Sequence, residues 1–271
     1  MKVKLIIDAI VNDKLIALKK FKLYIYPVYI FDDTKFKMER IPELYKYRHI
    51  SFDLWLTLIK SNPEFKNKRN LLFKDFFSID KPMDEVAAVI RKFDVLTNSI
   101  NEKVCCNFNT YEIYYLILDA MGGDIEKYSG NDLDVFYNHT EALLMEYKPL
   151  LLSDDIPETL ASLHQKGITA NILSNTAFIK GSSLRKIVSH YGLTDYFSFQ
   201  AYSDETGYSK PGVEMYNYAY NEILKLDTIE KNEILHVGDN RISDYNGAKN
   251  FGFDAYLITN QPINEPNLQP A

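Results

Sequence analysis

The sequence that decides the fold is residues 50–58, which read Ile-Ser-Phe-Asp-Leu-Trp-Leu-Thr-Leu. This short apolar run stops at an acid, Asp53. Two later apolar runs also stop at polar residues: 170–173 before Ser174 and Asn175, and 234–237 before Gly238 and Asp239. Short apolar runs that alternate with helical patterns are typical of parallel strands joined by crossover helices. Because such sheets bind ligands beyond the carboxyl ends of their strands, we expect these polar residues to share one site.

Composition limits the class of protein. The chain has 271 residues, 46% of them hydrophobic, so it can bury a substantial core in one large domain or two smaller ones. Its net charge is −6 and its basic residues are dispersed, so we expect no nucleic-acid partner. The adjacent Cys105 and Cys106 have no metal-type spacing and favour a reducing compartment. No uninterrupted apolar stretch reaches the roughly 18 residues of a membrane span, and we expect a soluble, cytoplasmic protein.

The chain divides by pattern into an N-terminal extension at 1–47, a core at 48–60 and 150–271, and a helical module at 61–149. The extension could be a hairpin at the sheet edge or a stretch preceding a start at Met38. In the module, Asn62 and Pro63 form a helix start. Apolar residues then recur at helical spacing, which predicts four amphipathic helices packed as a bundle. The module could be a structural appendage, but its place directly after the Asp53 strand favours a lid.

The polar residues at the strand ends suit phosphoryl transfer. A carboxylate that is desolvated on one side, such as Asp53, can act as a covalent nucleophile. Together with Asp239 it could share one Mg²⁺, a cation that takes oxygen ligands. Lys210 could neutralise the non-bridging oxygens, and Ser174 and Thr57 could donate hydrogen bonds to them. Alone, each residue has an ordinary explanation as a turn residue, a helix cap or a surface lysine.

In this order, the residues resemble the signatures of the haloacid dehalogenase-like (HAD) hydrolase superfamily over about residues 48 to 260. The signatures fall at residues 53–58, Ser174, Lys210-Pro211, and Gly238-Asp239 with Asp244. The resemblance implies an α/β fold: a three-layer α/β/α Rossmannoid core with a parallel sheet. It also makes the inserted helical module a C1 cap.

The resemblance further implies a role for each residue. Asp53 would be the nucleophile of an aspartyl-phosphate mechanism, assisted by Thr57. The phosphoryl group of a small phosphorylated substrate would be held by Ser174, Asn175 and Lys210. Mg²⁺ would be bound by Asp53, the Trp55 carbonyl and Asp239, with support from Asp244. The tyrosine-rich composition could serve a homo-oligomer interface or only the core.

Trp55 departs from the family pattern. Family phosphatases have an Asp there, which protonates the leaving oxygen, whereas tryptophan cannot exchange a proton at neutral pH. General acid catalysis contributes roughly 10²–10⁴-fold to the rate, so its loss should slow the hydrolysis of alkyl phosphates more than that of acyl or aryl phosphates. We favour a Mg²⁺-dependent phosphohydrolase that is slow or selective for activated leaving groups, or that recruits another acid from the helical module or the N-terminal segment. The alternatives are a catalytically silent phospholigand-binding protein and, less favoured, a 2-haloacid dehalogenase, since family dehalogenases carry an aromatic residue at this position.

Three further residues have simpler explanations than catalysis. His236 stands inside an apolar run, and we expect it to be a core histidine. Lys66 and Arg69, early in the helical module, could reach an anionic substrate, but solvated surface charge is the simpler interpretation. The sequence therefore leaves the substrate open.

Overall fold

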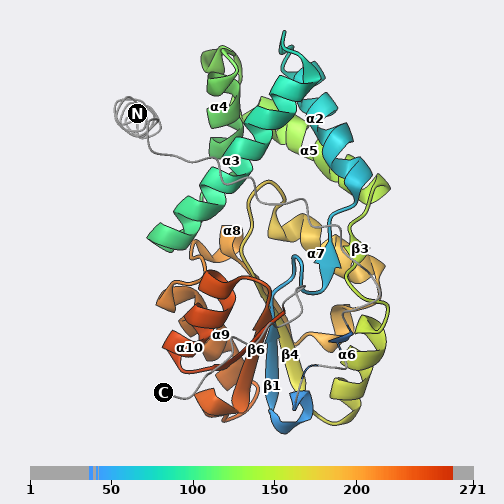
Figure 1. Ribbon diagram of the computed structural model, residues 1–271, viewed down its shortest axis with the longest axis vertical. Coiled ribbons are helices and arrows are strands. Elements are labelled where there is room, and N and C mark those ends of the chain that lie inside the picture. Colours follow the sequence, from blue (N-terminus) through green and yellow to red (C-terminus); the bar gives the residue numbers. More distant parts are fainter. Residues whose placement is uncertain (1–36, 39–40, 42, 259–271) are drawn as a thin grey trace, which may run out of the picture.

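The computed structural model describes residues 37–38, 41 and 43–258, and shows a sheet-centred core beneath a group of four helices (Figure 1). The central sheet is parallel, with five strands in the order β5-β4-β1-β6-β7. The strands are β1 (His49–Phe52), β4 (Thr169–Ser174), β5 (Phe199–Tyr202), β6 (Ile234–Gly238) and β7 (Asp254–Leu257). Every residue of β1 and β6 is buried, as expected for strands covered on both faces.

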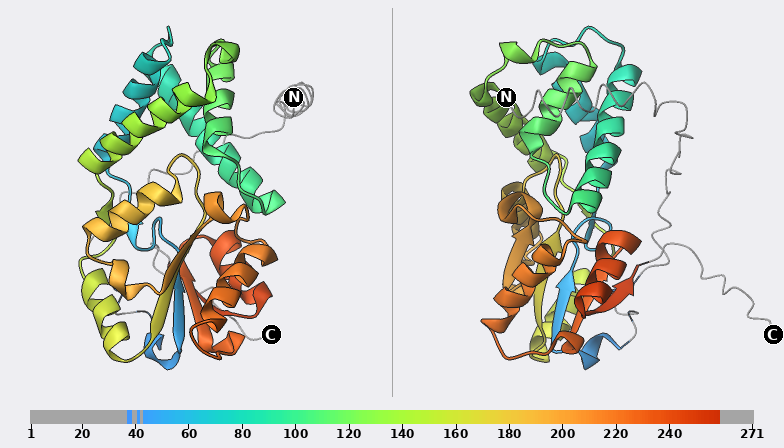
Figure 2. Two further views of the ribbon diagram at one scale, coloured as in Figure 1. Left: turned by 180° about the vertical axis from the view of Figure 1, so that it is seen from behind. Right: turned by 90° about the vertical axis from the view of Figure 1, so that its left-hand side faces the viewer.

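Helices cover both faces of this sheet. They are α6 (Ile156–Gln165), α7 (Gly181–His190), α8 (Ser203–Thr206), α9 (Val213–Leu224) and α10 (Gly247–Phe251). Figure 2 shows α6 and α7 on one side of the strands and α9 and α10 on the other. The two sides have separate hydrophobic clusters, one shared by α6, α7 and the four-helix group, the other formed by α9, α10 and their strands. The predicted α/β fold with its three layers is therefore confirmed.

A π-helical turn precedes the last core helix. α10 starts at Gly247, directly after the turn η6 (Arg241–Asn246). The side chain of Asn240 accepts hydrogen bonds from the main-chain N–H groups of Ile242 and Ser243, at 2.8 and 3.0 Å. This cap fixes a wide first turn. Such turns are often found at functional sites.

The four-helix group consists of α2 (Pro63–Phe76), α3 (Met83–Val104), α4 (Thr110–Ala120) and α5 (Gly130–Glu146). The chain enters and leaves it through two short antiparallel strands, β2 (Ile59–Lys60) and β3 (Leu150–Leu151). Helix α2 begins as predicted, with Asn62 Oδ1 accepting from the Glu64 N–H at 3.0 Å. The aromatic interior of the group centres on Phe136, whose ring centroid lies 4.8 Å from that of Phe77 and 4.9 Å from that of Tyr114.

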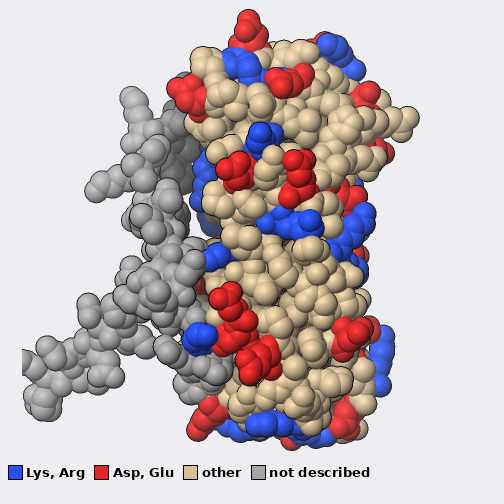
Figure 3. Space-filling model, turned by 90° about the vertical axis from the view of Figure 1, so that its right-hand side faces the viewer, with Lys and Arg blue, Asp and Glu red and all other residues tan. Residues whose placement is uncertain are grey.

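Short 3₁₀ turns complete the described part: η2 (Leu44–Lys46), η3 (Ile125–Lys127), η4 (Thr194–Tyr196) and η5 (Lys231–Glu233). Of the N-terminal extension, Met38, Ile41 and Leu44 are buried in the larger hydrophobic cluster. The hairpin considered for this extension falls mostly on residues 1–36, which lie outside the described residues. No helix in the described part is long and apolar enough to cross a membrane. One long side of the molecule carries acidic and basic side chains interspersed (Figure 3).

The aromatic interior of the four-helix group should contribute strongly to stability. We expect Phe136→Ala to lower the free energy of unfolding by about 3–5 kcal/mol, because it leaves a cavity where a ring is 1% exposed. The neighbouring Val135→Ala, at a side chain that is 47% exposed, should change it by less than about 0.5 kcal/mol. Denaturant titrations of both variants measure the difference, and equal effects would contradict this assignment of the interior.

Candidate active site

Asp53 lies at the centre of the carboxyl edge of the sheet. Strand β1 runs between β4 and β6, so the residue that follows it is flanked by the ends of both neighbours. The Asp53 N–H donates to the Val237 carbonyl at 2.8 Å, which extends the ladder by one residue and fixes the acid. The residue is buried, with 7% of its surface exposed. The topology therefore brings Asp53, Ser174 and Asp239 to one edge of the sheet, as the sequence predicts.

Lys210 joins two of the predicted carboxylates. Its Nζ donates to Asp53 Oδ1 at 2.8 Å and to Asp244 Oδ1 at 2.6 Å, and the residue is 1% exposed. Burial opposes the charged form of the lysine, but the carboxylates of Asp244 and Asp53 outweigh burial and raise the pKa of Lys210. The ammonium is therefore charged and held between two acids.

Asn175 holds the loop that carries this lysine. Its Oδ1 accepts from the Lys210 main-chain N–H and its Nδ2 donates to the Lys210 carbonyl, both at 2.8 Å. From the sequence we predicted only a substrate contact for Asn175. Its positioning role was missed because no local sequence pattern pairs the loop after β4 with the loop that carries Lys210. The substrate contact stays a prediction.

Asp244 is fixed from several directions. Its Oδ2 accepts from the Asn240 N–H at 2.9 Å, and its Oδ1 lies 3.3 Å from His236 Nε2. Gly238 leaves room for this carboxyl, since a Cβ there would come within 2.3 Å of the Asp244 Cγ. The π-helical turn η6 therefore returns the Asp244 side chain to the end of β6.

His236 is fully buried, in line with the expectation of a core histidine. It also supports the site, because its Nδ1 lies 3.0 Å from Ser51 Oγ while its Nε2 faces Asp244. Burial lowers the pKa of His236, against the opposing effect of the Asp244 hydrogen bond, so the ring is neutral at neutral pH.

Three carboxylates crowd this edge. Asp53, Asp239 and Asp244 each offer an oxygen within 4.8 Å of the others. Burial raises the pKa of Asp53 to about 6 against the charge of Lys210, and burial with the charge of Asp53 raises the pKa of Asp239 to about 8. For Asp244, Lys210 and His236 outweigh burial and lower its pKa. Among the described residues Asp239 has no ion-pair partner, so the oxygen-rich cluster suits a hard divalent cation.

The remaining predicted residues lie around the cluster. Thr57 is buried, and its Oγ1 donates to Asp53 Oδ2 at 3.5 Å. Ser174 is buried at the end of β4, where its hydroxyl donates to the Asn175 carbonyl at 3.4 Å.

Trp55 is half-buried against the larger hydrophobic cluster. The chain reverses directly after it, with the Leu56 N–H bonded to the Ile59 carbonyl at 2.7 Å. The metal contact of Trp55 and the phosphoryl contact of Ser174 stay predictions.

The carboxyl end of α3 contacts two loops of the site. Glu102 Oε1 accepts from Asn240 Nδ2 at 2.6 Å and from Ser243 Oγ at 2.9 Å, beside Asp244. Just beyond the helix, the Ser209 N–H donates to the Cys105 carbonyl at 3.0 Å, next to Lys210. No sequence signal pointed to these contacts. They tie the four-helix group to the segments that carry Lys210 and Asp244.

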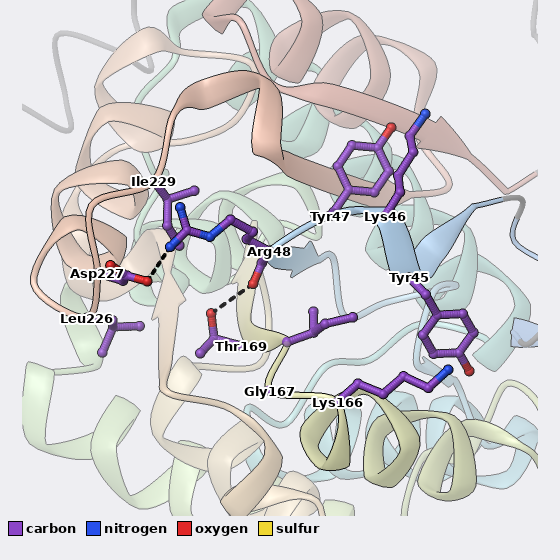
Figure 4. A pocket seen from close by; sticks show the side chains of 11 residues that line it. Tyr45, Lys46, Tyr47, Arg48, Lys166, Gly167, Thr169, Leu226, Asp227 and Ile229 are labelled. Carbon is purple, nitrogen blue, oxygen red and sulfur yellow. Dashed lines mark hydrogen bonds and ion pairs between the residues drawn. The ribbon is translucent and has the colours of Figure 1, made fainter.

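A separate cavity of about 430 Å³ lies at the opposite, amino edge of the sheet (Figure 4). Arg48 on its wall is paired with Asp227, and Lys166 Nζ lies 3.6 Å from the centroid of the Tyr45 ring. The carboxylate cluster is not part of its lining. Because parallel sheets bind ligands at their carboxyl ends, we place the chemistry at Asp53 and not in this cavity.

Removing the central lysine tests the electrostatics of the site. In Lys210→Met two buried carboxylates lose their cation, so we expect about 3–5 kcal/mol less free energy of unfolding at about pH 8. Without the lysine, the folded-state pKa of Asp53 rises further and that of Asp244 is no longer held down, so both lie above their unfolded values. The loss should therefore shrink as the pH falls to about 5 and the acids protonate.

The matched control is Lys225→Met, at a lysine whose side chain is 66% exposed beside Glu222. It should cost less than about 1 kcal/mol at both pH values. Denaturant titrations at the two pH values measure both variants. A loss for Lys210→Met that does not change with pH would contradict the account.

Comparison with known proteins places the chain in a family. The haloacid dehalogenase-like hydrolase model matches residues 47–252. The ribulose-1,5-bisphosphate 5-phosphatase of Halopiger xanaduensis is 33% identical over 108 residues, 40% of this chain and 42% of that protein. The (S)-2-haloacid dehalogenase of Pseudomonas sp. (strain YL) is 33% identical over 132 residues, 49% of this chain and 53% of that protein. The chain thus spans about half the length of these curated relatives.

The fold has solved counterparts as well. The structure of the HAD-hydrolase YfnB from Bacillus subtilis has a TM-score of 0.56 and 19% identity, and covers 83% of this chain and 90% of that chain. At this identity the likeness establishes the fold alone. With the family match over residues 47–252, the chain belongs to the haloacid dehalogenase-like hydrolases.

Proposed function

We propose that the chain is a Mg²⁺-dependent phosphohydrolase that acts on a small phosphorylated metabolite through an aspartyl phosphate on Asp53. The observation that carries this proposal is the buried Lys210 between Asp53 and Asp244, with the unpaired Asp239 beside them among the described residues. A carboxylate nucleophile must attack an anionic phosphoryl group, so it needs this positive charge nearby. We further propose that residues 61–149 are a cap domain and that the protein is cytoplasmic.

Asp53 acts as the nucleophile in this scheme. With a pKa of about 6, Asp53 is ionised at neutral pH and its carboxylate attacks phosphorus. The bond to the leaving oxygen then breaks, and the electron pair departs with that oxygen. Lys210 and Ser174 hold the non-bridging oxygens while Thr57 orients Asp53. In the second step water attacks phosphorus and releases Asp53 as a carboxylate.

The acidic cluster would hold the cation. Asp53, Asp239 and the Trp55 carbonyl would be its ligands, with Asp244 in support. When bound, Mg²⁺ would neutralise phosphoryl charge and orient the group for in-line attack. The HAD-hydrolase YfnB of Bacillus subtilis, which shares this fold, has been solved bound to magnesium, and this supports the same cation here.

Trp55 limits which phosphates can be turned over. Because the indole supplies no proton, the leaving oxygen must depart unprotonated or take its proton from water. We therefore propose a preference for acyl or aryl phosphates over alkyl phosphates. Related proteins include a phosphatase and a dehalogenase, and the carboxylate cluster favours the first, since carbon–halogen hydrolysis in this family needs no metal.

The first test is hydrolysis of acetyl phosphate and p-nitrophenyl phosphate with and without Mg²⁺. We expect Mg²⁺-dependent turnover that falls to background in Asp53→Asn, a nearly isosteric change that removes the nucleophile. Folding of the variant is checked by its thermal unfolding. Turnover that survives this substitution would sink the proposal, as would the complete inactivity of folded wild type. Metal-free release of halide from a 2-haloacid would instead identify a dehalogenase.

The effect of the missing acid can be tested by restoring it. Trp55→Asp should raise kcat/KM on alkyl phosphates by up to about 10²-fold, because their leaving groups need a proton. Aryl phosphates should gain far less. Trp55→Asn is the control, because asparagine is similar in size to aspartate but cannot act as a general acid. An equal gain on both substrate classes would contradict this account of Trp55.

A further inference from the structure

Arg69, on α2, is a cation that the proposed chemistry does not use. The expectation of solvated charge holds for Lys66, which is exposed, but is wrong for Arg69, which is half-buried. Its guanidinium carbon lies 4.7 Å from the centroid of the Phe178 ring. The sequence did not predict this contact, because Phe178 lies in a distant loop that hydrophobic periodicity cannot place.

Most N–H groups of this guanidinium have no hydrogen-bond partner among the described residues. Nη2 donates to Asn70 Oδ1 at 3.1 Å, while Nε is buried without a hydrogen-bond partner in the part of the chain that the structure describes. A guanidinium has five N–H donors in a rigid fork. A buried donor left unpaired is destabilising, and such groups normally have a partner.

Arg69 also has no acid of its own among the described residues. Within the described residues no carboxylate lies at ion-pair distance from Arg69. Asp94 of α3 is the acid that acts on it most, but that carboxylate is already paired with Arg91 at 2.6 Å. Burial lowers the pKa of Arg69 and Asp94 offsets this only in part. A desolvated cation in this setting would be stabilised by an anion.

Arg69 stands over the loop that starts at the proposed phosphoryl site. Phe178 lies in the segment between Ser174, at the end of β4, and the start of α7. This segment reaches toward the four-helix group (Figure 1). The segment is held there by Thr110, whose Oγ1 donates to the Ala177 carbonyl at 2.7 Å. The helical group therefore presents a cation to the loop that begins at Ser174 and Asn175, and Asn175 is bonded to the main chain of Lys210.

We propose that Arg69 binds a second anionic group, a carboxylate or another phosphate, on the phosphorylated substrate. This rests on the proposed function and narrows its substrate class to small phosphates with two anionic ends. The planar fork suits this task because it pairs with carboxylate and phosphate oxygens in a bidentate way. An arginine that only fastened the helices to the loop would contribute equally to every substrate.

The test compares two acyl phosphates with matched leaving groups, acetyl phosphate and the carboxylated succinyl phosphate. Wild type should prefer succinyl phosphate. In Arg69→Met its kcat/KM should fall about 10–100-fold, mainly through KM, because a charge-assisted bidentate contact is lost. The kcat/KM for acetyl phosphate should change less than about threefold, because this substrate has no second anionic group to lose a contact. Arg69→Lys should recover part of the preference.

Lys68→Met removes the same charge from an exposed position one residue away and should leave the preference intact. Thermal unfolding shows whether each variant is folded. Equal losses on both substrates in Arg69→Met, or no preference in wild type, would overturn the proposal. Acetyl phosphate turnover that depends on Asp53 reports the proposed function separately, so the two failures can be told apart.

Discussion

The site depends on one buried ammonium. Lys210 stands between Asp53 and Asp244, and without this arrangement each of these charges would be desolvated without a counter-charge. The contact joins the end of β1, the turn after β6 and the loop before α9. Strand order makes it possible, because β1 lies between β4 and β6. The lysine therefore fixes the geometry and supplies the charge that the proposed phosphoryl transfer would require.

Charge is divided between the two parts of the molecule. The core gathers carboxylates at the sheet edge, where a divalent cation would balance them, and the four-helix group turns Arg69 toward the loop after β4. Glu102 ties the end of α3 to the turn that carries Asp244. The helices thus reach both loops of the site. This division favours a ligand that is anionic at both ends.

The sequence predicted what is local and periodic. Parallel strands covered on both faces give continuous apolar runs, so the strand ends at Asp53 and Ser174 could be located, and Asn62 marked the start of α2 through its capping side chain. What it missed depends on contacts between distant segments. The π-helical turn follows from the Asn240 cap, and the burial of Arg69 follows from Phe178. Neither leaves a periodic trace in the sequence.

The most direct test of the central claim is to look for phosphate on Asp53. Because Trp55 cannot activate the second-step water, the acyl phosphate should accumulate during turnover. Acid-quenched protein, sampled during acetyl phosphate hydrolysis and analysed by mass spectrometry, should show one phosphoryl group on the peptide that contains Asp53, removable by neutral hydroxylamine. Measurable turnover with Asp53 unmodified would contradict the account.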